Sequence, residues 1–222
     1  MVTTTRVRTD HDLQGLVQEE LRWTPDVDAD AIGVAVDDGT VRLSGEVRTF
    51  SERVAALRAT ERVRGVRTVI DDITVHPSPQ GSVSETDVAK EVARALSTSV
   101  NVPDSIRAEV HGHAVVLIGE AEWDYQRAAA RRAVQVLPGV LSVDNRVTLT
   151  ARPSAPDARE RIARAIARNA LLDSDSIHVA VTGTTVTLTG SVRSWAARRQ
   201  AAQAAWASPH VTAVDNRLAV SI

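Results

Sequence analysis

The chain has 222 residues, of which 43% are hydrophobic and 24% charged, and its formal net charge is −2. These values are typical of a folded globular protein and exclude wholesale disorder. The near-neutral charge gives no overall attraction to nucleic acid or to anionic membranes. The absence of cysteine excludes disulfides, thiol catalysis and cysteine-ligated zinc.

One pattern occurs three times along the chain. The segments 41–47, 115–121 and 186–192 read alike, and their glycines are spaced by 74 and then 71 residues. Because the same register holds over about forty residues, three repeats of one unit are predicted. The aligned residues are the glycines Gly45, Gly119 and Gly190, the upstream acids Asp30, Asp104 and Asp175, and the downstream residues Asp71, Asn145 and Asn216.

In chain order, each repeat is predicted to form a helix, two strands, a second helix and a last strand. Apolar residues at helical spacing, such as Leu13, Val17 and Leu21, indicate the opening helix. Two segments of alternating polarity joined by a glycine-containing turn then predict a β-hairpin. An Ala- and Arg-rich segment predicts the second helix. The closing strands are expected at 66–75, 140–149 and 211–220.

We therefore expect an α+β fold of three tandem α-β-β-α-β units, each with two helices packed on a three-stranded mixed sheet. Linkers rich in Pro and Ser separate the units, and the predicted domains are 10–77, 84–150 and 156–222. A unit of this size is marginally stable alone, so the units are expected to pack on one another. The sheet face opposite the helices is expected to be solvated or packed on a neighbouring unit, because it carries Arg42, Thr187 and Thr189.

The repeated pattern resembles the BON domain, and the resemblance covers nearly the whole chain three times. The motifs Val-x-Leu-x-Gly-x-Val and Gly-Val-x-x-Val-x-Asn-x-Leu carry it. Two residues depart from the family pattern, since His210 replaces a glycine and Asp71 replaces the usual Asn. The resemblance implies a bacterial protein associated with the envelope, with osmotic or other stress, and with phospholipid binding.

No motif of an active site is present, so we expect a protein that is not an enzyme and binds no cofactor and no metal. His111 and His113 are interpreted as a solvated turn because no third ligand has matching spacing. The repeated glycines are interpreted as backbone positions that need a positive φ, a bulge or a close approach. The repeated acids are expected to fix turns, with an ion site as the weaker alternative, and the amides to bond an adjacent loop.

Aromatic residues and charge indicate candidate surfaces. Trp123, Trp195 and Phe50 are expected to seat the second helix of each unit, whereas Trp23 is a candidate for insertion into a membrane interface or a partner. Acidic and basic side chains number 14 and 8 in the first unit, 9 and 7 in the second, and 5 and 8 in the third. The third opening helix carries the candidate lipid- or partner-binding residues Arg159, Arg161, Arg164 and Arg168.

The favoured hypothesis is a stress-associated module that contacts anionic phospholipid or a protein partner through helix faces, and not nucleic acid. A sensor of a small ligand or of a cation such as potassium is the alternative, and a structural or chaperone-like role is a third. The charge gradient also suggests that the third domain of one copy attracts the first domain of another. We expect a soluble cytoplasmic protein with no transmembrane segment, and a periplasmic or envelope location is the alternative.

Overall fold

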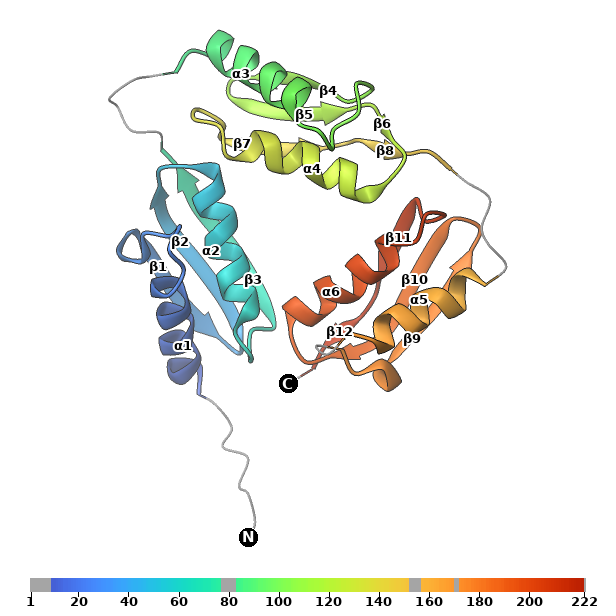
Figure 1. The fold of residues 1–222 in the computed structure, drawn as a ribbon. Helices are drawn as coiled ribbons and strands as arrows, with labels where there is room; N and C mark the ends of the chain where they lie inside the picture. The colour runs from blue at the N-terminus through green and yellow to red at the C-terminus, as the bar shows by residue number, and fades with distance from the viewer. Residues whose placement is uncertain (1–8, 77–82, 152–156, 170–171, 222) are drawn as a thin grey trace.

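The computed structural model describes residues 9–76, 83–151, 157–169 and 172–221, which form three α/β units that follow one another along the chain (Figure 1). The first unit has the order helix, hairpin, helix, strand that the sequence predicts. Its elements are α1 (Asp10–Arg22), the 3-10 turn η1 (Ala29–Ala31), β1 (Ile32–Asp37), β2 (Thr40–Val47), α2 (Phe50–Arg62) and β3 (Thr68–Val75).

The second and third units repeat this order, with the strands broken into shorter pieces. The second comprises α3 (Glu85–Thr98), β4 (Arg107–His111), β5 (Ala114–Ile118), β6 (Glu120–Ala121), α4 (Asp124–Gln135), β7 (Ser142–Asn145) and β8 (Thr148–Leu149). The third comprises α5 (Ala158–Ala167), η2 (Ser174–Ser176), β9 (Ile177–Thr182), β10 (Thr185–Val192), α6 (Trp195–Trp206), β11 (Ala213–Asn216) and β12 (Ala219–Val220).

The main sheet of each unit is mixed, as predicted, and β6 and β8 form a separate parallel pair in the second unit. The hairpin strands β1 and β2 pair antiparallel, and β3 pairs parallel to β2 after the crossover through α2. The same order occurs as β4-β5-β7 and as β9-β10-β11. The middle strand of each main sheet is therefore the second strand of its hairpin, and the fold class inferred from the sequence is confirmed.

Helix starts follow from local sequence. The Thr9 hydroxyl accepts a hydrogen bond from the backbone N–H of Asp12, and Ser84 caps α3 in the same way. Thr49 and Ser194 cap α2 and α6, the second helices of their units, by the same kind of bond. A hydroxyl at this position satisfies one of the N–H groups that the first turn of a helix leaves without a partner.

One aliphatic core lies between the two helices and the sheet of each unit. Leu21 and Leu43 are fully buried in the first, Leu117 in the second, and Ile162 and Leu188 in the third. The opposite face of each sheet is largely solvated in the described residues. Arg42 and Asp72 form an exposed ion pair there, Thr189 is exposed, and Thr187 is half-buried.

The units contact one another through their second helices. These helices, α2, α4 and α6, face the middle of Figure 1 and are called the inner helices, and the opening helices α1, α3 and α5 are called the outer helices. Phe50 and Val54 at the start of α2 belong to the core of the second unit. Trp195 at the start of α6 packs on the core of the first unit, and its indole N–H donates to the Arg67 carbonyl at 2.9 Å. In the second unit the Arg127 guanidinium lies over the Trp206 ring, 4.5 Å from its centre.

These contacts close a ring of three units. The start of α2 contacts the second unit, the start of α4 contacts the third, and the start of α6 contacts the first. Head-to-tail contacts of this kind form a closed ring when the rotation between units closes. The expectation that the small units lean on one another is met in this way, within one chain.

Candidate functional site

The outer helix α5 presents a basic surface. Ile162 and Ile166 face the core and are buried, which leaves the arginines of α5 on the exposed side. The guanidinium of Arg161 bonds the Asp157 carboxylate at 2.8 Å. Arg159 lies 3.4 Å from the carboxylate of Glu160.

Two further arginines, Arg164 and Arg168, complete this surface. Arg164 and Arg168 are exposed and form no ion pair with the part of the chain that the structure describes. A hollow of about 290 Å³ lies beside Arg164, and its lining is mostly apolar. The surface thus combines a cationic rim with an apolar hollow, which is the combination that an amphipathic ligand needs. The lining residues are Ala163, Arg164, Ile166, Ala167, Ser174, Ile177 and Val179.

Trp23, the other candidate, lies on the first unit and is separate from this surface. It follows the last residue of α1, and 78% of its surface is exposed. Figure 1 shows α1 and α5 on opposite sides of the ring. Trp23 and the arginines of α5 therefore do not form one site.

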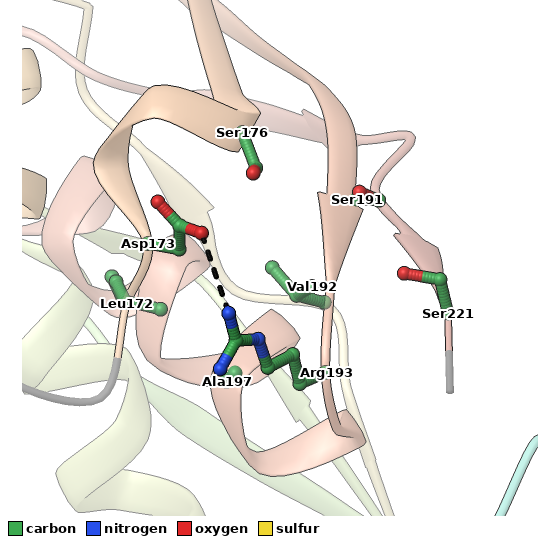
Figure 2. A pocket seen from close by; sticks show the side chains of 8 residues that line it. All are labelled: Leu172, Asp173, Ser176, Ser191, Val192, Arg193, Ala197 and Ser221. Carbon is green, nitrogen blue, oxygen red and sulfur yellow. Dashed lines mark ion pairs between the residues drawn. The ribbon is translucent and has the colours of Figure 1, made fainter. Parts of the chain in front are cut away.

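A second hollow, of about 410 Å³, lies in the third unit near the start of α6 (Figure 2). Its polar lining includes Ser176, Ser191 and Ser221, and the carboxylate of Asp173 lies 3.8 Å from the guanidinium of Arg193. A serine nucleophile needs a base within hydrogen-bonding reach, and neither histidine nor lysine lines this hollow. The arrangement does not resemble the site of a serine hydrolase.

The three repeated glycines have a backbone function. Their φ angles are 125°, 119° and 115°, a region that favours glycine. A Cβ atom on Gly45 would lie 2.1 Å from the carbonyl oxygen of Ala31, and Gly119 and Gly190 would give 2.2 and 2.0 Å at the equivalent carbonyls. The close approach is therefore between the second strand and the turn before the first strand.

The repeated amides join the last strand to the second helix of the same unit. Asn145 donates through Nδ2 to the Arg127 carbonyl at 2.8 Å, and its Oδ1 accepts from the Val147 N–H at 3.2 Å. Asn216 makes the equivalent bonds to Arg198 and Leu218. Each amide thus bonds the adjacent loop, as the sequence suggested, and also a helix carbonyl that the sequence did not indicate.

Asp71 stands at the equivalent position of the first unit. Because a carboxylate cannot donate a hydrogen bond, Asp71 accepts one from the side chain of Arg53 instead of donating to a helix carbonyl. It accepts from the Arg53 Nε at 2.9 Å and from the Ile73 N–H at 3.2 Å.

The repeated acids upstream of the first strand form no such bonds. Asp30, Asp104 and Asp175 are all exposed, and their carboxylates bond none of the described residues, so the expected turn-fixing bonds are not seen.

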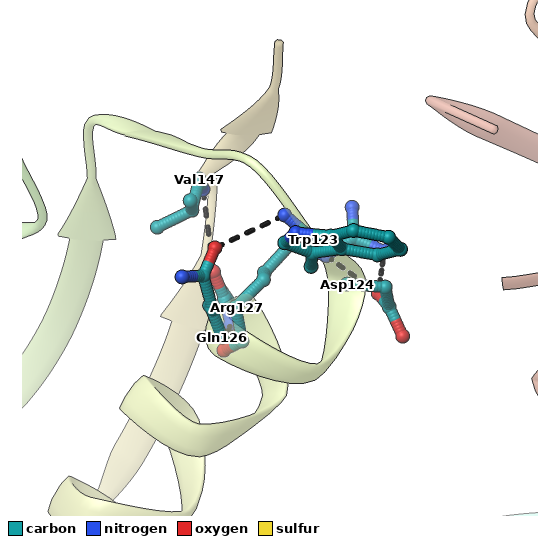
Figure 3. Close-up of polar contacts among 6 residues, drawn as sticks. Trp123, Asp124, Gln126, Arg127 and Val147 are labelled. Carbon is teal, nitrogen blue, oxygen red and sulfur yellow. Dashed lines mark hydrogen bonds and ion pairs between the residues drawn. The ribbon is translucent and has the colours of Figure 1, made fainter. Parts of the chain in front are cut away.

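The aromatic residues near the inner helices have two different functions. Phe50 and Trp195 anchor their helices on neighbouring units, as described above, and not on their own sheets. Trp123 precedes α4, and its backbone N–H donates to the Gln126 side chain at 3.1 Å (Figure 3). Arg127 in the next turn bonds Asp124 at 3.0 Å, which fixes the start of this helix.

The two histidines of the second hairpin have separate partners. Nδ1 of His113 lies 3.0 Å from the Gly139 carbonyl, whereas His111 lies 3.6 Å from the carboxylate of Glu109. Among the described residues, no three His, Asp or Glu side chains come together with metal-binding geometry. No helix in these ranges is both long enough and apolar enough to cross a bilayer.

Comparisons with known proteins agree with the repeat. The family model of the BON domain matches residues 9–77, 84–151 and 154–221. Two solved structures of CdsD, described as a structural protein of the type III secretion system of Chlamydia trachomatis, are similar to the chain. They are 16% and 18% identical, with 97% and 95% of this chain and 100% and 92% of theirs covered, and both TM-scores are 0.27. At this TM-score the likeness carries no argument about function. A search of curated proteins found no match.

Proposed function

The chain belongs to the BON domain family, of which it carries three tandem copies, and from this we propose that it is a non-enzymatic binding protein that docks on anionic phospholipid surfaces through α5. The observation that carries the proposal is the excess positive charge of Arg164 and Arg168 beside the apolar hollow. Basic side chains approach anionic headgroups, and the hollow accepts an apolar group from the same surface.

The wider role proposed is a stress-associated one, with the cytoplasm as the place of action and the periplasm as the alternative. Trp23 gives the first unit a separate exposed aromatic surface, which we propose as a second point of contact with a membrane or a protein. The proposal requires no chemistry at the serine-lined hollow.

Vesicle sedimentation tests the lipid contact. The full chain should pellet with vesicles containing phosphatidylglycerol at low salt and remain in the supernatant with phosphatidylcholine alone, because the attraction is electrostatic and screened by salt. The double variant Arg164→Glu and Arg168→Glu should lose pelleting. The matched control reverses Lys90 and Arg94 on α3, the equivalent helix of the second unit.

Two results would contradict the proposal. One is that the native chain fails to pellet with anionic vesicles at low salt. The other is that the α3 control loses pelleting as fully as the α5 variant, since net charge alone would then explain binding. Vesicle binding retained by the α5 variant would also contradict the proposal, because the lipid contact would then lie outside α5.

A further inference from the structure

The three inner helices are strongly basic. Within their bounds α2, α4 and α6 carry eight arginines and three acidic residues. Several of these arginines have partners inside their own unit. These are Arg53 with Asp71, Arg62 with Glu20, Arg127 with Asp124, and Arg198 with the carbonyls of Asn216 and Leu218.

Three of the remaining arginines converge where the units meet, one from each inner helix. Arg199 of α6 forms an ion pair with Glu61 of α2. Arg58 precedes Glu61 by three residues and therefore lies on the same side of α2. Arg131 follows Arg127 by four residues, which places it on the side of α4 that faces the third unit.

The electrostatics of these groups agree with this placement. Partial burial, and then the charge of Arg58, lowers the pKa of Arg131. The same two causes, in the same order, lower the pKa of Arg199 although Glu61 pairs with it. Arg58 is therefore close enough to act on both. Arginine keeps its charge at neutral pH, and among the ion pairs of the described residues only Glu61 pairs with any of these three cations.

We infer that Arg58, Arg131 and Arg199 form a binding site for a multivalent phosphate group at the junction of the three units. Guanidinium groups bind phosphate oxygens through two parallel N–H donors, and three of them arranged around one point suit an anion with several oxygens. Solvent reaches the cluster, since Arg58 and Arg131 are exposed and 38% of the Arg199 side chain is exposed. The ligand would replace repulsion between the units with attraction.

Titration calorimetry of the full chain with sodium tripolyphosphate at low ionic strength tests this site. We expect saturable binding with one ligand per chain. Arg58→Gln and Arg131→Gln should each weaken binding about tenfold, which corresponds to about 1.4 kcal/mol. Arg107→Gln, on the solvated face of the second sheet, removes the same charge and should bind like the native chain.

Thermal unfolding without ligand shows whether each variant is folded, so that a loss of binding is not mistaken for a loss of structure. Without ligand, both variants should melt no lower than the native chain because each removes a like charge from the cluster. At one tripolyphosphate concentration, the Tm of the native chain should rise more than that of either variant. The inference fails if no saturable binding occurs, or if Arg107→Gln weakens binding as much as Arg58→Gln.

Vesicle experiments distinguish a lipid headgroup from a free phosphate compound as the source of the anion. If Arg58→Gln combined with Arg131→Gln loses both tripolyphosphate and anionic vesicles, the ligand is a headgroup. If it loses tripolyphosphate and retains vesicles, the ligand is free in solution. The α5 variant should bind tripolyphosphate normally, so failure of the α5 proposal would leave this inference standing.

Discussion

The first and third units share one fold and differ in the chemistry that they display. The outer helix of the first unit begins with Asp10 and Asp12, whereas that of the third carries four arginines along its length and at its end. Both units have a glycine whose missing Cβ admits a backbone carbonyl. The close approach between the second strand and the turn before the first strand is therefore the same in both units, whereas their exposed surfaces differ in charge.

The shared glycine gives the largest expected effect. Gly45→Ala and Gly190→Ala should each destabilise the affected unit by more than about 3 kcal/mol, because the new Cβ would overlap a carbonyl oxygen at a positive φ. Denaturant unfolding followed by circular dichroism measures this loss. Equal losses in the two units would sharpen the comparison.

Gly15→Ala is the matched control for the glycine variants. Gly15 lies inside α1, and a Cβ there would meet no heavy atom within 4 Å. We expect this change to stabilise the chain by about 1 kcal/mol, since alanine is favoured over glycine in helices. If Gly45→Ala were as well tolerated as Gly15→Ala, the close approach would not be the reason for glycine at that position.

The contact that joins the third unit to the first gives a smaller effect. Trp195→Ala removes the indole that packs on the first core and donates to Arg67, and it should cost about 2 kcal/mol. Calorimetry should show one melting transition for the native chain and two for the variant, because the third unit is uncoupled from the first. Trp23→Ala removes an exposed indole and should change stability by less than about 0.5 kcal/mol. Equal effects of both tryptophan changes would argue against closure of the ring through Trp195.

Asn216 of the third unit and Asp71 of the first occupy equivalent positions, and changing one into the other should have the smallest effect on the free energy of unfolding. Asn216→Asp removes the donor to the Arg198 carbonyl and should destabilise the third unit by about 1 kcal/mol. Asp71→Asn loses a partly exposed ion pair but provides a donor for the Arg53 carbonyl, so a change within about 0.5 kcal/mol is expected. Urea titrations of both variants measure the difference. A larger loss at Asp71 than at Asn216 would show that the acid is specifically required.

Much of the fold could be predicted because its signals are local. The hydrophobic periodicity identified the buried Val17 and Leu21 of the opening helix, and the hairpin strands formed where alternation was seen. The repeated amides were expected to form hydrogen bonds, but the helix carbonyl that accepts them lies 18 residues away in the chain. Helical spacing shows where a residue lies on its own helix and not which unit it contacts. Phe50 and Trp195 were expected to seat their helices, but the sequence did not show that each packs on the core of a neighbouring unit.

Four features follow from the amino-acid sequence alone, because each depends on residues of a single unit. They are the three repeats, the order of their elements, their aliphatic cores, and the glycine where the second strand approaches the turn before the first strand. The closure of the ring and the grouping of arginines from different units follow only from the packing of the units. Arg199 meets Glu61 across 138 residues, and Trp195 meets Arg67 across 128. Contacts at such separations leave no periodic signal in the chain, since they arise from the packing of units that have already folded.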